Sequence, residues 1–111
     1  MGKENRAGLR KPVNVSVIVS ELNGADHNAI SADISEGGIC LYTGKKEIQS
    51  GDIVNIKFNI LVRGKYMDVK AEAKVVHQSP HKYHGLTVGL EFLHLDDSSL
   101  LALKSIVSTV R

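Results

Sequence analysis

The strongest constraint on how this 111-residue chain can fold is a period-two alternation of apolar and polar side chains. Alternation of this kind is typical of β-strands that bury one face and expose the other. The length suits one domain with a single core, and a content of 42% hydrophobic and 23% charged residues is ordinary for a globular protein. The segments expected to be strands are residues 13–20, 30–35, 39–43, 54–62, 67–75 and 86–92.

Turn signals lie between these strands, and a helix signal follows the last one. Asn23-Gly24 and Arg63-Gly64-Lys65 predict hairpins, and residues 78–85, which contain Pro80, are expected to form a loop. Residues 96–99 read Asp-Asp-Ser-Ser, which favours a helix start. An apolar stripe at helical spacing follows, made of Leu100, Leu103, Ile106, Val107 and Val110.

The pattern predicts an all-β fold, a six-stranded antiparallel β-barrel with a C-terminal α-helix. Residues 1–11 are polar and lack periodicity, so we expect them to form a flexible N-terminal arm. Residues 12–111 would then form the barrel domain with its helix.

One polar motif interrupts the second strand, Asp33-Ile-Ser35-Glu-Gly37-Gly38. If the apolar residues of this strand face the core, Asp33 and Ser35 project from the outer face of the barrel. Gly37 and Gly38 lack a Cβ, so they permit a sharp turn and a close approach by a ligand. The residues expected to face the core are Ile30, Ala32 and Ile34.

A second motif, Arg6-Ala-Gly-Leu-Arg10, places two guanidinium groups four residues apart just before the first strand. Guanidinium groups donate paired hydrogen bonds to phosphates or to a guanine edge, and they stack on flat bases. The formal charge is only +2 and no basic block occurs, so a duplex nucleic acid is not the expected partner. A small dianionic ligand needs only a few well-placed cations.

In order, the motifs read R-x-x-x-R and D-x-S-x-x-G, and the pair resembles the signature of the PilZ domain family. Val88-Gly-Leu-Glu-Phe92 is similar to the last strand of that family. The resemblance implies a bacterial second-messenger receptor for cyclic di-GMP, which signals by a change of conformation or partner. It also implies the ligand-binding residues, which are Arg6, Arg10, Asp33, Ser35, Gly37 and Gly38.

The resemblance implies a binding protein without a cofactor or catalytic residues, and two alternatives stand beside it. The first is a PilZ-like protein-interaction module that works mainly by docking to a partner. The second is an oligonucleotide-binding barrel, which three Tyr, two Phe and no Trp disfavour, because single-strand binders use aromatic stacking platforms.

The histidines, the cysteine and the apolar runs of the sequence do not point to a further functional site. His77, His81 and His84 surround Pro80 and are interpreted as a polar loop, so no metal is expected. Cys40 is the only cysteine and is interpreted as a structural thiol, which fits a reducing compartment. No apolar run is long enough to cross a bilayer. We therefore expect a cytoplasmic protein that is not inserted into the membrane.

Overall fold

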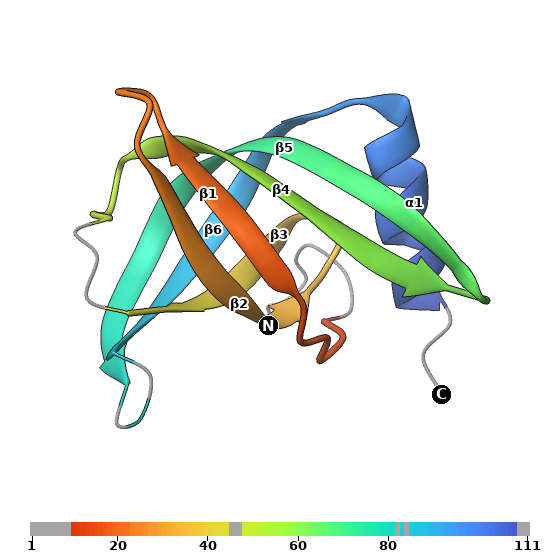
Figure 1. Cartoon of the computed structure of the whole chain (residues 1–111), viewed down its shortest axis with the longest axis horizontal. Coiled ribbons are helices and arrows are strands. Elements are labelled where there is room, and N and C mark those ends of the chain that lie inside the picture. Colours follow the sequence, from red (N-terminus) through yellow and green to blue (C-terminus); the bar gives the residue numbers. More distant parts are fainter. Residues whose placement is uncertain (1–9, 45–47, 82, 84, 109–111) are drawn as a thin grey trace, which may run out of the picture.

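The strands of this chain close into an antiparallel barrel flanked by one helix (Figure 1). The computed structural model describes residues 10–44, 48–81, 83 and 85–108. Around the barrel the strands lie in the order β1-β2-β3-β6-β5-β4, and pairing of β4 with β1 closes the ring. The predicted fold is therefore confirmed. Its elements are β1 Ser16–Glu21, β2 Asp26–Ile34, β3 Gly38–Thr43, β4 Ile53–Val62, β5 Lys65–His81, β6 Gly85–Leu95 and α1 Asp97–Ser108.

Period-two alternation fills the barrel with branched aliphatic side chains. Along β4, every second residue from Val54 to Val62 is buried, and their neighbours in the strand face solvent. Val17 and Val19 of β1 are fully buried, as the sequence predicts. Side chains from all six strands and from α1 join in one hydrophobic cluster, so a single core supports both the barrel and the helix.

The two predicted hairpins form, each with a glycine in the left-handed region. Between β1 and β2, the N–H of Gly24 donates to the carbonyl of Glu21 at 2.9 Å, and Gly24 has a φ of 95°. Between β4 and β5, Arg63 and Gly64 have φ values of 53° and 82° and form a two-residue loop. Positive φ at both positions matches the right-handed twist of the flanking strands.

The predicted loop over residues 78–85 begins too early, because β5 continues as a strand through Pro80 to His81. Its last residues pair with β6, and Pro80 lies opposite Leu86. The last pair between β5 and β4 is at Lys74. Pro80 therefore lies where β5 has lost its other neighbour, and a missing backbone N–H is tolerated at such an edge.

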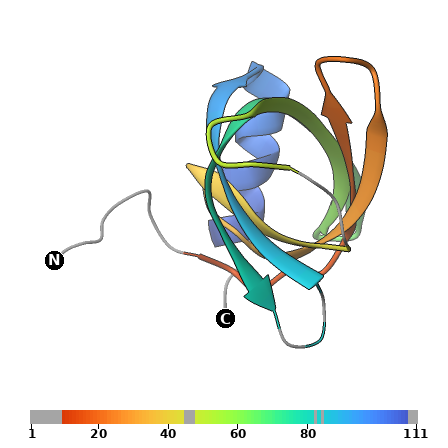
Figure 2. The same ribbon diagram turned by 90° about the vertical axis from the view of Figure 1, so that its left-hand side faces the viewer.

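Helix α1 begins at a capped end and buries one face against β4 and β5. In Figures 1 and 2 it lies on the side of the molecule away from the β1–β2 hairpin. The carboxylate of Asp96 accepts the N–H of Ser99 at 2.8 Å. This backbone hydrogen bond is the main cause that lowers the pKa of Asp96. In the described part of the chain, no helix has the length and apolar character to span a membrane.

Ser99 joins the helix to the sheet. Its buried hydroxyl accepts the backbone N–H of Lys70 at 2.9 Å. Lys70 lies one residue before Ala71, where the pairing of β5 with β6 begins. The helix thus supplies the acceptor that the neighbouring strand does not reach.

We expect Ser99→Ala to lower the free energy of unfolding by about 1–3 kcal/mol, because it leaves the part-buried N–H of Lys70 without an acceptor. Ser98→Ala removes a hydroxyl from the same turn, but Ser98 is exposed and its loss should cost less than about 0.5 kcal/mol. Urea denaturation of both variants measures the difference. Equal stability of the two would show that the Ser99–Lys70 bond does not anchor the helix.

Candidate ligand-binding site

The segment that leads into the barrel pairs with β2, and this pairing fixes the position of Arg10. Lys11 and Ile34 exchange two backbone hydrogen bonds, of 2.8 and 2.9 Å. Lys11 therefore already pairs with the barrel, one residue before the expected start of the domain at Pro12. Arg10, the residue just before this bridge, is held beside the first residue of the D-x-S-x-x-G motif.

A buried serine that the sequence analysis did not single out fastens this entry segment to β2. The hydroxyl of Ser31 accepts the N–H of Val15 at 2.9 Å and donates to the carbonyl of Val13. The side-chain amide of Asn14 donates to the carbonyl of Ser31 at 2.8 Å. Ser31 is fully buried, so these bonds satisfy a hydroxyl that water cannot reach.

Arg10 forms an ion pair with Asp33. Its Nε lies 2.8 Å from Oδ1 of Asp33, and their side chains are 48% and 32% exposed. A pair so open to solvent contributes only about 0–1 kcal/mol to stability, so its main effect is to orient the guanidinium. The structure thus brings together one residue from each motif, while Arg6 lies outside the described residues.

The prediction that Ile30, Ala32 and Ile34 all face the core is wrong, because β2 contains a bulge. Ser31 lies opposite Leu41 and Asp33 opposite Cys40, so Ala32 is an extra residue. Ile30 is consequently 51% exposed, whereas Ile34 is fully buried. A bulge re-aims the side chains that follow it. Asp33 reaches the outer face for this reason and not through unbroken alternation.

The prediction that Ser35 projects outward is also wrong. Ser35 is fully buried, and its hydroxyl accepts the N–H groups of Gly38 at 3.1 Å and Gly37 at 3.3 Å. Its own N–H donates to the carbonyl of Gly38 at 2.9 Å. Strand β2 ends at Ile34, so the alternation no longer applies at this position. Ser35 is therefore a buried residue that stabilises the turn by hydrogen bonds.

The expected reason for the two glycines also needs correction. Neither Gly37 nor Gly38 is among the described residues with positive φ, so the turn does not depend on glycine's wider conformational range. A Cβ at Gly38 would instead overlap the backbone carbonyl oxygen of Leu90 on β6. The N–H of Phe92 donates to the carbonyl of Gly37 at 2.9 Å. Gly38 is thus required for the close approach of β3 to β6.

A groove of about 650 Å³ opens beside this turn. Asp33 borders it through the ion pair with Arg10. Val76 reaches it because β5 has its own bulge, which leaves Val76 unpaired between Val75 and His77 and 53% exposed. The bulge gives no signal in the sequence, so Val76 was missed. The lining residues are Arg10, Gly37, Gly38, Val76, Gly89, Leu90, Glu91 and Phe92.

The outer face of the site combines the guanidinium of Arg10 with the carboxylate of Asp33 and the thiol of Cys40. Cys40 pairs with Asp33 across β2 and β3. Burial raises the pKa of the Cys40 thiol, the negative charge of Asp33 raises it further, and Arg10 opposes both. In the same turn, Glu36 accepts a hydrogen bond from Lys104 of α1 at 3.3 Å. Charged groups beside a groove walled by apolar atoms suit a ligand with both anionic and flat apolar parts.

The comparison with protein families decides which fold family this is. The profile of the PilZ domain matches residues 4–108, almost the whole chain. The chain belongs to the PilZ domain family. Both motifs lie within the matched residues, and so do all six strands. No curated protein sequence matches the chain significantly.

Solved PilZ structures share the barrel at low sequence identity. Bacillus subtilis MotI/DgrA, an inhibitor of motility, has a TM-score of 0.83 at 18% identity over 98% of this chain and 55% of its own. Escherichia coli YcgR in complex with c-di-GMP has a TM-score of 0.76 at 16% identity. The match covers 96% of this chain and 46% of the YcgR chain. The PilZ domain of CeSA from a cellulose-synthesizing bacterium has a TM-score of 0.59 at 15% identity. The match covers 91% of this chain and 96% of the CeSA domain. The likeness establishes the fold, and this chain spans about half of MotI/DgrA and of YcgR.

Cys40 offers a chemical probe of the charges at the site, because it is the only cysteine. Asp33→Asn should lower the pKa of the thiol, since loss of a neighbouring negative charge favours the thiolate. Arg10→Ala should raise it. The pH dependence of iodoacetamide alkylation measures the pKa apart from any change in access, because the rate follows the thiolate fraction. One common pKa for parent and variants would contradict this geometry.

Gly38→Ala should lower the free energy of unfolding by about 3 kcal/mol, which is the upper end of the usual cost of overpacking. The cost is high because the added Cβ meets a backbone carbonyl, which cannot move aside as a side chain can. Gly44→Ala is the matched control, since a Cβ there meets no atom within 4 Å. Urea denaturation compares the two. If Gly38→Ala is as stable as Gly44→Ala, the close approach of β3 to β6 is not a constraint on the motif.

Proposed function

We propose that this PilZ domain is a receptor for cyclic di-GMP. The observation that carries the proposal is the ion pair between Arg10 and Asp33 beside a groove next to the Gly37-Gly38 turn. Support comes from membership of the PilZ family and from the YcgR structures, which contain c-di-GMP. The ligand has two phosphates and two guanine bases, which match a guanidinium, a carboxylate and an apolar groove.

Each residue of the proposed site has a distinct task. The ion pair uses the Nε–H of Arg10, and its terminal N–H groups would donate to a phosphate or to the Hoogsteen edge of guanine. Asp33 would accept hydrogen bonds from the ring N–H and amino group of guanine. Arg6 would supply a second guanidinium. Gly37 and Gly38 line the groove, and Ser35 would act indirectly by holding their turn.

Ligand binding, and not catalysis, is the proposed activity, in the cytoplasm and without a cofactor. The signal would pass on as a change of conformation or of partner. Glu36 lies in the motif turn and bonds Lys104 on α1, so a shift of the turn would reach the helix. The second candidate, a module that works mainly by docking to a protein partner, is favoured by exposed apolar residues on the helix and on the β4–β5 hairpin, Leu101, Leu61 and Tyr66.

Calorimetry with cyclic di-GMP, and separately with a single-stranded oligonucleotide, tests the proposal. We expect saturable binding of cyclic di-GMP and none of the oligonucleotide, because the described residues offer no row of aromatic platforms. Binding of the oligonucleotide alone would favour the nucleic-acid-binding barrel. Binding of neither would leave partner docking as the better hypothesis.

Arg10→Ala should weaken cyclic di-GMP binding by about thirty- to a hundredfold, corresponding to charge-assisted hydrogen bonds of about 2–3 kcal/mol. Arg10→Lys should restore binding only in part, because an ammonium keeps the charge but lacks the planar fork. Lys57→Ala is the control, since it removes the same charge from an exposed position on β4. Calorimetry measures affinity, and thermal melting checks the fold. An Arg10→Ala protein that is folded and binds as tightly as the parent would show that the site is elsewhere.

A further inference from the structure

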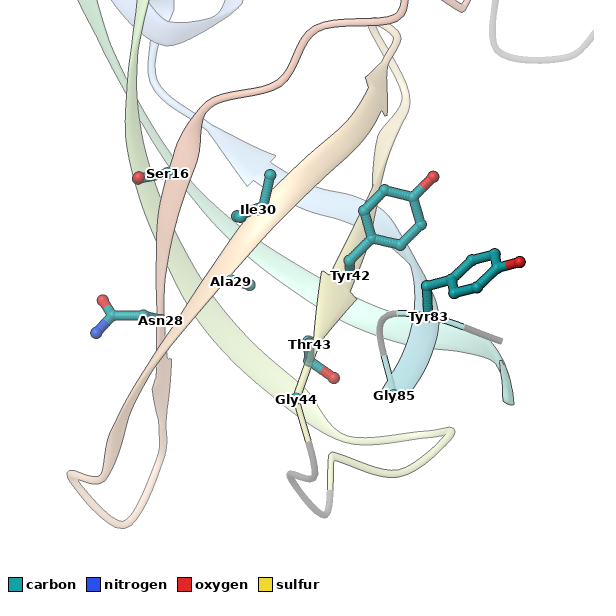
Figure 3. Close-up of a pocket in the computed structure, with 9 residues that line it drawn as sticks. All are labelled: Ser16, Asn28, Ala29, Ile30, Tyr42, Thr43, Gly44, Tyr83 and Gly85. Atoms are coloured by element: carbon teal, nitrogen blue, oxygen red, sulfur yellow. The ribbon is translucent and has the colours of Figure 1, made fainter. Parts of the chain in front are cut away.

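A second hollow opens on the barrel, where β2 and β3 separate (Figure 3). Its volume is about 640 Å³, and none of the described residues that line it is charged. This distinguishes it from the groove beside Arg10. The lining residues are Ser16, Asn28, Ala29, Ile30, Tyr42, Thr43, Gly44, Tyr83 and Gly85.

Strand β2 has a free backbone edge at this hollow. Its pairing with β3 ends at Ile30 and Tyr42, whereas its pairing with β1 continues to Asp26. In an antiparallel ladder, alternate residues direct their N–H and C=O groups to opposite sides. Ser31 directs its N–H to Val15 on the β1 side, so Asn28 directs its backbone groups toward the gap. Within the described part of the chain, no strand pairs with Asn28 there.

Thr43 provides a buried hydroxyl without a described partner at the same place. Its side chain is 2% exposed, and its Oγ1 has no hydrogen-bond partner among the described residues. A buried hydroxyl without a partner is costly, and most such groups in proteins are satisfied. Thr43 lies across the gap from Asn28 and Ala29 (Figure 3). The hollow is therefore bordered by hydrogen-bonding capacity on both sides.

Aromatic and aliphatic side chains form the apolar part of the hollow. Ile30 is 51% exposed and Tyr83 is 79% exposed. Tyr42 packs edge-on against His81, with ring centroids 5.0 Å apart, and the ring centroid of Tyr83 lies 6.2 Å from that of the same histidine. Figure 3 shows Tyr42 and Tyr83 among the residues that line the hollow. Exposed apolar side chains gathered around one hollow mark an interaction site more strongly than scattered ones do.

We propose that this hollow, bordered by the free edge of β2, binds an extended peptide segment of a partner protein that places an uncharged aromatic or large aliphatic side chain against the lining that includes Tyr42 and Tyr83. A strand edge specifies its occupant, because an extended backbone presents N–H and C=O groups at the spacing that Asn28 requires. The described residues of the lining carry no charge, so they favour an uncharged side chain. This site does not depend on cyclic di-GMP or on the Arg10 groove.

A phage-displayed library of random linear heptapeptides tests the proposal on the full chain. We expect the selected peptides to share one uncharged aromatic or large aliphatic residue. Tyr83→Ala should weaken their binding by about tenfold or more, a loss typical of an aromatic contact residue. Tyr66→Ala is the matched control, because Tyr66 is 78% exposed on another part of the sheet. Peptides that bind both variants equally, or a selection that yields no peptide dependent on Tyr83, would overturn the proposal.

The backbone part of the proposal needs its own measurement. N-methylation of a selected peptide at alternate residues should abolish binding in one register and spare it in the other, because only one set of N–H groups faces β2. Asn28→Pro should weaken binding to a similar degree, and amide shifts in NMR spectra check that this variant is folded. Equal tolerance of both N-methylated sets would show that the hollow takes a side chain or a small aromatic molecule without strand pairing. A concentration-dependent dimer that Tyr83→Ala dissociates, in the absence of peptide binding, would identify a second copy of the chain as the occupant instead.

Discussion

The extra residue in β2 is the constraint on which the site depends. Because Ala32 has no partner on β3, Ser31 faces inward before the bulge and Asp33 faces outward after it. The inward hydroxyl of Ser31 then ties the entry segment to β2. The bridge of Lys11 with Ile34, just past the bulge, brings Arg10 within 2.8 Å of Asp33. Unbroken pairing would have placed Asp33 inside the barrel.

The described residues of the two motifs divide between support of the fold and contact with solvent. Ser35 and Gly38 are buried, one within the turn and the other against the backbone of Leu90. Arg10 and Asp33 are partly exposed and contribute little to stability. A motif residue can thus serve the fold of the barrel or the binding of a ligand. Separate measurement of stability and of affinity distinguishes these two roles residue by residue.

The groove and the hollow share β3 but differ in chemistry. Cys40 of β3 lies opposite Asp33 at the groove. Tyr42, two residues further along β3 and on the same face of the strand, lines the hollow. Charged side chains beside the groove suit an anionic ligand, whereas the uncharged hollow suits an apolar side chain and a peptide backbone. One small barrel wall therefore carries two hollows of different chemistry.

The sequence by itself determined the features that depend on neighbours along the chain. Alternation predicts the strands, glycine marks both hairpins, and Asp96 starts the helix, because each signal acts within a few residues. Only the tertiary structure decided the features that depend on distant partners. The bulges at Ala32 and Val76, the continuation of β5 through Pro80, and the need for Gly38 all arise from pairing with other strands. Period-two reasoning carries no information about such pairing, since one inserted residue reverses every face that follows it.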